Sequence, residues 1–165
     1  MVDLEIHPVR LGEAPALEAR GQAGYVHDRL ARQDDGRGVF LAAWRGDLAV
    51  GSVYLWLEPA EEAEIREHLP ETPLITHLEV FAGSRNQGIG TRLVEAAEQV
   101  LRDRHYTTVA LAVELSNVDA ERLYKRLGYQ DWGFGRVDCI QREWLPDDTL
   151  LETREECTVL VKLLG

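Results

Sequence analysis

One stretch of the chain, residues 85–91 (Arg-Asn-Gln-Gly-Ile-Gly-Thr), combines residue types that suit a phosphate-binding turn. Residues 74–81 before it are typical of a strand, and residues 89–104 after it have apolar residues at helical spacing. A glycine-bearing turn between a strand and a helix directs several backbone N–H groups at one place, where the positive end of the helix dipole adds to their field. Gly88 and Gly90 lack a Cβ atom, so an anion can approach the backbone closely. The stretch therefore predicts a phosphate site.

Two better-known phosphate loops do not fit this stretch. A dinucleotide-binding fingerprint needs a third glycine where Leu93 stands, and a P-loop over residues 83–88 needs lysine where Ile89 stands. The pattern that remains is Arg-x-x-Gly-x-Gly at a turn from strand to helix. Short glycine-rich turns also serve simply to begin helices, so the turn alone leaves that alternative open.

A second motif covers residues 117–129, which read Asn-x-x-Ala-x-x-Leu-Tyr-x-x-Leu-Gly-Tyr. It predicts a helix over residues 118–127, with Asn117 at the N-cap and Gly128 ending the helix in the left-handed conformation. The residues on the apolar face of this helix are Ala120, Leu123, Tyr124 and Leu127.

Together the two motifs resemble the signatures of the GCN5-related N-acetyltransferases (the GNAT family), in the family's order. The resemblance implies an α/β (α+β) fold with a mixed, mostly antiparallel central sheet flanked by helices, and acetyl-CoA as co-substrate without a metal. It also implies that the backbone of residues 80–82 pairs with the pantetheine arm, that the Val80 N–H faces the acetyl carbonyl, and that residues 87–91 take the pyrophosphate. The implied cofactor-binding residues are Val80, Phe81, Ala82, Arg85, Gln87, Gly88, Ile89, Gly90, Thr91 and Asn117.

The motif position of Tyr124 marks it as the candidate general acid, although an aromatic residue at this spacing also suits an ordinary core. For the general base, the strand at residues 74–81 offers His77 and Glu79, which share one face because side chains alternate along a strand. Either side chain can accept the amine proton directly or through water. Each is equally compatible with an ordinary exposed strand residue, and the family has no single base position that decides between them.

The remaining segments complete an order of elements that matches the same fold. We expect a first strand over residues 4–10, followed by one bent helix or two short ones over residues 14–32, interrupted by Gly21 and Gly24. The other expected elements are a hairpin of strands 39–44 and 48–57 turning at 45–47, an acidic surface segment 58–73 with a short helix at 60–68, and strands at 107–114, 134–143 and 155–163.

The composition limits the classes of function. The chain has 165 residues and a net charge of −11, which suits one domain spanning residues 1–165 and argues against nucleic-acid binding. The charge is compatible with a cationic substrate or simply with solubility. No apolar run is long enough for a membrane span and the N-terminus lacks signal-peptide features, so we expect a cytoplasmic protein. We expect Cys139 and Cys157 to be buried free thiols, with a disulfide as the alternative and no zinc-site spacing.

These observations predict an acetyl-CoA-dependent N-acetyltransferase that acts by direct attack in a ternary complex. The acceptor would be a primary amine, on a small cationic molecule or on a protein. Two alternatives stay open: a non-catalytic acyl-CoA-binding module of the same fold, and an enzyme that uses a longer acyl group. The last two strands contribute Trp144, Leu160 and Leu163, some of which we expect to face outward. Because exposed sheet edges need cover, we expect a homodimer.

Overall fold

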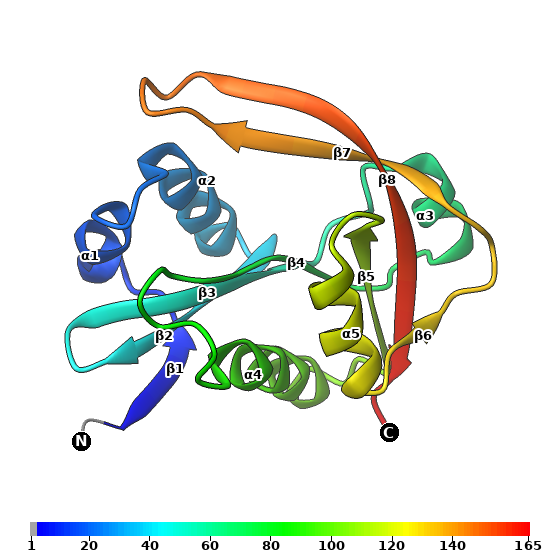
Figure 1. The fold of residues 1–165 in the computed structure, drawn as a ribbon, viewed down its shortest axis with the longest axis horizontal. Helices are drawn as coiled ribbons and strands as arrows, with labels where there is room; N and C mark the ends of the chain where they lie inside the picture. Colours follow the sequence, from blue (N-terminus) through cyan, green and yellow to red (C-terminus); the bar gives the residue numbers. More distant parts are fainter. Residues whose placement is uncertain (1–2) are drawn as a thin grey trace.

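The computed structural model describes residues 3–165, which form a sheet with helices on both faces (Figure 1). In chain order the elements are β1 (Leu4–Pro8), a 3₁₀ helix (Leu11–Glu13), α1 (Ala14–Glu18), α2 (Ala23–Asp34), β2 (Gly38–Arg45), β3 (Leu48–Trp56), α3 (Ala63–His68), β4 (Leu74–Val80), α4 (Ile89–Asp103), β5 (Thr108–Glu114), α5 (Val118–Arg126), β6 (Gln130–Asp131), β7 (Val137–Trp144) and β8 (Leu150–Leu163).

The sheet has eight strands in the order β1-β2-β3-β4-β5-β8-β6, and β7 pairs with β8. Every neighbouring pair is antiparallel except β4 and β5, which run parallel. The sheet is therefore mixed and mostly antiparallel, as the family resemblance implied.

Each face of the sheet buries its own apolar core. On one face, α2 packs through Tyr25 and Val26 into a cluster with Phe40 of β2. On the other face, α4 packs through Leu93 and Leu101, and α5 adds its apolar side to the same cluster. In Figure 1, α1 and α2 lie above the sheet and α4 lies below it. We call these the α2 face and the α4 face.

A β-bulge in β4 decides which face its later residues occupy. The register between β3 and β4 shifts next to Ser52, where β4 carries an extra residue, and His77 there has a left-handed φ of 52°. Ile75, before the bulge, belongs to the core of the α4 face. Strict alternation would have turned His77 and Glu79 to that face as well. The bulge turns both to the α2 face, where His77 stacks on Tyr25.

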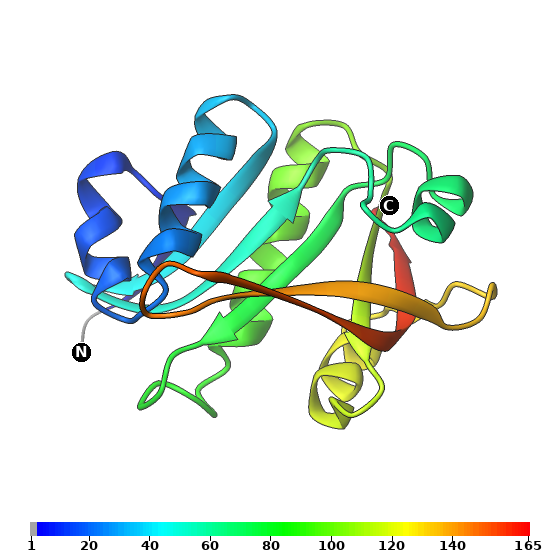
Figure 2. The same cartoon turned by 90° about the horizontal axis from the view of Figure 1, so that it is seen from above.

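The parallel pair β4 and β5 is joined at a single position, Leu74 opposite Ala110. Beyond this position the two strands diverge, as Figure 2 shows from above. The later part of β4 is therefore paired with β3 on one edge only. On its other edge, the backbone N–H and C=O groups face the gap toward β5.

The hairpin of β7 and β8 reaches across the α2 face and contacts α2 at its tip. An ideal Cβ on Gly24 of α2 would lie 2.5 Å from Cε3 of Trp144, so the indole ring packs directly against the helix backbone. The acidic segment after β3 is tied to the same hairpin, because the Glu62 carboxylate accepts a hydrogen bond from the Ile140 N–H at 3.0 Å. This segment therefore anchors the hairpin and is not only a solvated surface.

The expected helical region at residues 14–32 consists of two helices, α1 and α2. The chain turns between them at Gly21, whose φ of 103° suits a residue without a side chain. The expected hairpin turn at residues 45–47 is confirmed between β2 and β3. The expected short helix at 60–68 begins only at residue 63.

The C-terminal strands differ most from expectation. The last strand begins at Leu150 and not at residue 155, because residues 150–154 pair with β7 although their side chains are exposed. β7 spans 137–144, and the two-residue β6 was not expected. Of the residues expected to face outward, Leu163 is 78% exposed, Leu160 is buried, and Trp144 packs on α2.

Candidate active site

The turn between β4 and α4 has the geometry expected of a phosphate site. Gly88 is the N-cap of α4 with a φ of 76°, no side chain caps this helix end, and its first turn has no acidic residue. The helical hydrogen bonds begin with the Arg92 N–H donating to the Gly88 carbonyl at 3.1 Å. The N–H groups of Ile89, Gly90 and Thr91 therefore lack partners within residues 3–165. These free donors at the positive end of α4 fit an anion.

The end of β4 presents a free backbone donor. The Phe81 N–H donates to the Val50 carbonyl of β3 at 3.0 Å. Because hydrogen-bonding groups alternate along an antiparallel strand, Val80 directs its N–H and C=O to the opposite edge, toward β5. There the Val80 carbonyl accepts a hydrogen bond from Nε of Arg85 at 3.1 Å. The Val80 N–H keeps no partner in the part of the chain that the structure describes.

The close approach at Gly90 brings the two motifs together. An ideal Cβ on Gly90 would lie 3.7 Å from a methyl group of Leu123 on α5 and 3.7 Å from one of Val80 on β4. The start of α4 therefore packs between β4 and α5. The expected caps of α5 are confirmed: the Asn117 side chain accepts a backbone N–H of the first turn at 3.2 Å, and Gly128 has a φ of 99°. A contact of Asn117 with a cofactor stays a prediction.

Tyr124 lies on the face of α5 that packs into the α4-face core. The residue is 7% exposed, and its ring meets Tyr129 edge-on with the centroids 5.7 Å apart. No hydrogen bond joins its hydroxyl to another group among residues 3–165. Burial raises the pKa of Tyr124 above its ordinary value. The hydroxyl therefore stays protonated at neutral pH and is available as a hydrogen-bond donor.

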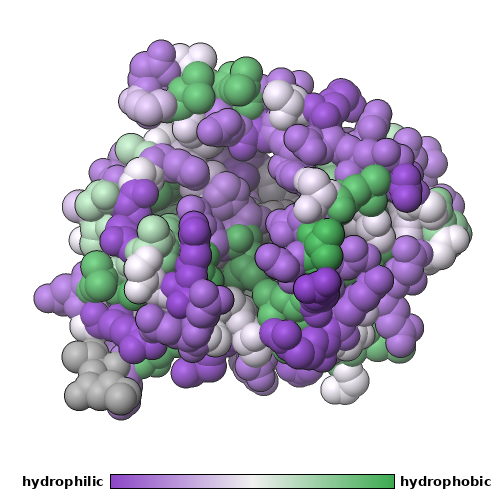
Figure 3. Space-filling view, in the orientation of Figure 1, coloured by the Kyte–Doolittle hydropathy of each residue, from purple (hydrophilic) through white to green (hydrophobic). Residues whose placement is uncertain are grey.

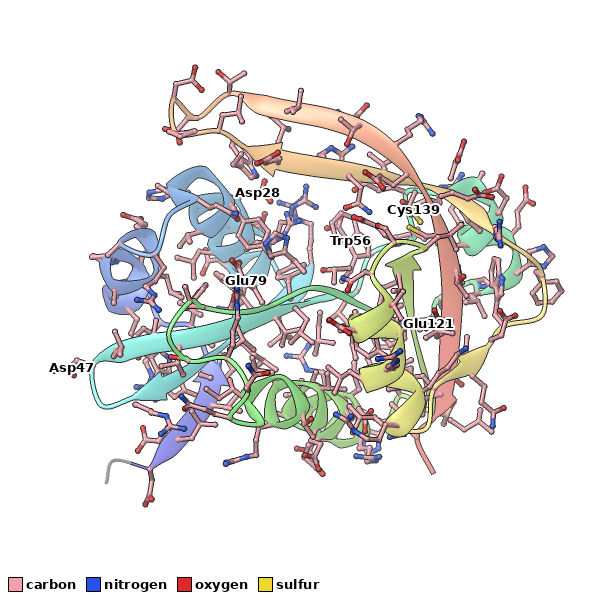
Figure 4. The ribbon with its side chains drawn as sticks, in the orientation of Figure 1. Asp28, Asp47, Trp56, Glu79, Glu121 and Cys139 are labelled. Atoms are coloured by element: carbon pink, nitrogen blue, oxygen red, sulfur yellow. The ribbon has the colours of Figure 1, made fainter. Side chains whose placement is uncertain are left out.

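His77 and Glu79 form a pair on the α2 face. Nε2 of His77 lies 3.6 Å from Oε2 of Glu79, and the imidazole stacks on the Tyr25 ring with the centroids 4.2 Å apart. The adjacent His77 imidazole lowers the pKa of Glu79, burial opposes this shift, and Arg85 adds to it. Glu79 is therefore ionised at neutral pH. Figure 4 shows Glu79 on the α2 side of β4.

A pocket beside Glu79 contains residues that the sequence did not single out. Ser52 lies opposite Glu79 in the β3–β4 register, and Tyr25, Arg20 and Gln22 belong to the same pocket wall. No local signal marks Ser52, because its place depends on which residue of β4 pairs with it. Tyr25 has the spacing of an ordinary core residue on its helix.

The surroundings of the site are polar. Figure 3 shows the surface hollowed between α2 and α5, below the β7–β8 hairpin, with mostly hydrophilic side chains around the hollow. Within residues 3–165, no group of His, Cys, Asp or Glu side chains is placed to hold a metal ion. In the same residues, no helix is long and apolar enough to cross a membrane.

Comparisons with known proteins find one relative by sequence and several structures with a similar fold. Rat N-acetyltransferase 8 is 36% identical over 74 residues, which are 45% of this chain and 32% of that protein, so the match spans about a third of the relative. An N-acetyltransferase structure from Staphylococcus aureus Mu50 has a TM-score of 0.70 at 11% identity, with 99% of both chains covered. Arabidopsis thaliana NAA60 in complex with acetyl-CoA has a TM-score of 0.69 at 19% identity, with 98% of both chains covered.

The family assignment rests on the larger part of the sequence. A family model for acetyltransferases matches residues 6–129, which include both motifs, the bulged strand β4 and α2. The structures just described share the fold from end to end. The chain therefore belongs to the acetyltransferase (GNAT) family.

Proposed function

We propose that the chain is an acetyl-CoA-dependent N-acetyltransferase, acting as one domain over residues 1–165, that moves an acetyl group to a primary amine by direct attack in a ternary complex. The observation that carries this proposal is the free Val80 N–H at the point where β4 leaves β5. An anion site at the start of α4 and an ionised carboxylate at Glu79 flank it on the two sides. The arrangement suits an anionic, acyl-bearing ligand on one side and a cationic acceptor on the other.

The residues present fit acetyl-CoA, which supplies the acetyl group as a thioester. The unpaired amides at the start of α4 would hold the pyrophosphate, and the unpaired edge of β4 would hold the amide-bearing arm. The Val80 N–H would donate to the acetyl carbonyl oxygen, where charge develops during transfer. The residues proposed to bind acetyl-CoA are Val80, Phe81, Ala82, Arg85, Gln87, Gly88, Ile89, Gly90, Thr91 and Asn117.

The proton-handling roles fall to two regions. Glu79, ionised at neutral pH, would hold the acceptor ammonium until it loses its first proton to water, because only the free amine can attack. The His77–Glu79 pair would then receive the second proton, which leaves the nitrogen after it has bonded to the acetyl carbon. A base of low pKa suffices for this step, because the nitrogen becomes far more acidic once it bonds to carbon. Tyr124 would donate its hydroxyl hydrogen to the departing sulfur. Since burial raises the pKa of Tyr124, a strong hydrogen bond to the thiolate is favoured over complete proton transfer.

The experiment that tests the proposal measures free thiol released from acetyl-CoA with a panel of primary amines. Tyr124→Phe should lower turnover by about 10²-fold and leave acetyl-CoA affinity nearly unchanged. Tyr106→Phe, on a residue of the same core that lies outside both motifs, is the matched control. Wild-type turnover in Tyr124→Phe, measured where chemistry limits the rate, would mean that Tyr124 is an ordinary core residue without a catalytic role.

The cofactor site has its own control. Gly88→Asp should abolish acetyl-CoA binding, because the carboxylate would occupy and repel the phosphate position. Gly36→Asp is closely matched, since Gly36 has a φ of 75° against 76° at Gly88 and both have open space around an added Cβ. Equal affinity of a folded Gly88→Asp protein and the Gly36→Asp control would contradict the site.

Two alternatives are separated by the same assay. Binding of acetyl-CoA without thiol release for any amine would favour a non-catalytic acyl-CoA-binding module. Faster turnover with longer acyl-CoAs would favour a different acyl donor. The unbridged thiols of Cys139 and Cys157 support a reducing compartment, and we propose the cytoplasm as the location.

We also propose a homodimer, built through the free edge of β8. Leu145 donates its N–H to the Thr149 carbonyl across the turn at 2.8 Å, so residues 151, 153 and 155 hydrogen-bond toward β7. Residues 150, 152 and 154 then point to the other edge, which no strand of the described chain pairs before β5 joins at Cys157. Leu150 and Leu151 on this stretch are 42% and 45% exposed.

The charges along this edge are self-complementary. A two-fold axis at Thr153 would place Glu152 opposite the partner subunit's Arg154, and Arg154 opposite the partner subunit's Glu152. Arg154→Glu should therefore give monomers in light scattering at micromolar concentration, and Glu152→Arg with Arg154→Glu should restore the dimer. A monomeric wild-type protein would contradict the proposal.

A further inference from the structure

The pocket beside Glu79 has a floor that suits an acceptor amine. Ser52 and Glu79 face each other across β3 and β4, and both belong to the pocket wall. Ser52 is 3% exposed, so its hydroxyl is a largely buried polar group at the base of the pocket. Glu79 contributes a negative charge. A hydroxyl oxygen and a carboxylate that face the same space can both accept hydrogen bonds from an ammonium group.

The rim of the same pocket carries a positive charge, opposite in sign to that of Glu79. The Arg20 guanidinium lies 5.0 Å from the centroid of the Phe81 ring and makes only a long hydrogen bond, 3.4 Å, to the Ala82 carbonyl. No carboxylate among residues 3–165 lies within ion-pair distance of it, in a chain whose net charge is −11. Arg20 is exposed at this rim, and its charge is free to meet a ligand carboxylate.

The start of α2 adds to this positive rim. Gln22, its N-cap, has a left-handed φ of 62°, its side chain does not cap the helix, and the first turn contains no acidic residue. By contrast, α5 is capped by Asn117 and carries Asp119 and Glu121 in its first turn. The uncapped amides of α2 and the Arg20 guanidinium thus meet at one rim of the pocket, and both favour an anion.

We propose that the acceptor is a free amino acid or a close analogue, bound with its amine at Glu79 and its carboxylate at Arg20 and the start of α2. The proposal rests on the proposed acetyl transfer and names its substrate class. The Tyr25 and Phe81 side chains also line this pocket, so the acceptor's carbon skeleton would meet aromatic rings beside the charged groups. The carboxylate requirement separates this class from simple amines and from protein N-termini.

The test compares four acceptors that share one side chain: leucine, leucinamide, isoamylamine and a leucine-first tripeptide. Thiol release from acetyl-CoA gives kcat/KM for each of them. Leucine should exceed the three others by about 10-fold or more, because only leucine carries the carboxylate beside its amine. Arg20→Gln should raise the KM for leucine by about 10- to 100-fold with little change in kcat, and should thereby remove most of the preference for leucine over leucinamide.

Two further variants make the result specific. Arg20→Lys should keep part of the preference for leucine, because it keeps the charge without the forked geometry. Arg104→Gln removes an arginine just after α4 and should change nothing. Equal rates for leucine and leucinamide, or a leucine preference that survives Arg20→Gln, would overturn this inference and leave the proposed function standing. A faster tripeptide would also overturn it, in favour of protein N-termini. No thiol release with any amine would overturn the proposed function itself.

Discussion

Two clusters of buried polar groups, one on each face of the sheet, differ in how well they are paired. On the α4 face, Glu98 is 3% exposed but well paired. It accepts a hydrogen bond from the Tyr129 hydroxyl at 2.7 Å and from Lys162 Nζ at 2.9 Å. On the α2 face, the hydroxyls of Tyr25 and Tyr54 are buried without a partner in residues 3–165.

The α2 face holds a further unpaired group in the same place. Arg29 lies between aromatic rings, its Cζ 4.7 Å from the Tyr25 centroid and 4.8 Å from the Tyr54 centroid, and its Nε has no hydrogen-bond partner among the described residues. An unpaired buried polar group costs about 1–3 kcal/mol. The Glu98 cluster therefore contributes to stability, whereas the α2 face keeps unpaired donors and strain, such as the left-handed His77, near Glu79.

The largest expected effect comes from breaking the paired cluster of the α4 face. Lys162→Met should lower the free energy of unfolding by about 3 kcal/mol, because it leaves the Glu98 carboxylate buried beside Tyr129 without its nearest cation. Urea unfolding followed by circular dichroism measures the change. Replacing both partners, Glu98→Met with Lys162→Met, should recover much of the loss. A single variant as stable as the wild type would remove the contrast between the faces.

A steric change should disturb the α2 face alone. Gly24→Ala places a methyl group where Trp144 packs, and such overpacking costs about 1–3 kcal/mol, although alanine in a helix is otherwise preferred to glycine by about 1 kcal/mol. The hairpin tip should shift, which raises the KM for the acceptor while acetyl-CoA affinity stays the same. Trp144→Leu in the same chain should relieve the clash. A change in acetyl-CoA affinity would show that the two faces are coupled.

Removing one buried tyrosine hydroxyl from each face tests whether a paired hydroxyl contributes more stability than an unpaired one. Tyr129→Phe should destabilise the protein by about 1–2 kcal/mol, because Glu98 loses a hydrogen-bond donor. Tyr54→Phe should leave stability within about 0.5 kcal/mol of the wild type or raise it, because the hydroxyl that it removes has no partner in the described chain. Thermal unfolding of the two variants side by side gives the answer. Equal losses would mean that an ordered water pairs Tyr54.

The smallest effect concerns the pH dependence of Glu79. Its pKa is lowered, first by the adjacent His77 imidazole, so the ionised carboxylate adds stability at neutral pH that is lost as the pH falls through the lowered pKa. Because the side chain is partly exposed, Glu79→Gln should lower the melting temperature at pH 7 by no more than about 2 °C. At a pH near ~3 the variant and the wild type should melt together. A difference that persists in acid would indicate a packing effect.

Local sequence patterns predicted the turns and helix ends that depend on residue types within a few positions. The turn before α4, the Asn117 cap and the Gly128 end follow from residue types whose conformational preferences act within a few positions. The hairpin at residues 45–47 follows in the same way. For the candidate site, the sequence predicted the turn before α4 and the region of Tyr124, because both depend on motifs within one or two elements.

The features that the sequence missed depend on partners far along the chain. The bulge at His77 contains no glycine that would have predicted it. It forms because pairing with β3 fixes the register of β4 on both sides of the bulge. Residues 150–154 read as a loop, since a strand exposed on both faces lacks the alternation that marks a half-buried one. Ser52 and Arg20 are candidate site residues only because the fold places them in one pocket with residues of β4 and α2.

The single bridge between Leu74 and Ala110 also has a mechanical consequence. It divides the sheet into a lobe of β1–β4 and a lobe of β5–β8, which share one backbone rung, so most of the stiffness across that line comes from side-chain packing. A ligand that hydrogen-bonds along the open edge of β4 and packs against α5 would connect the two lobes. The two lobes would then move relative to each other more in the free protein than in the ligand-bound protein. The fraction of protein with bound ligand and the rigidity of the sheet would therefore rise together.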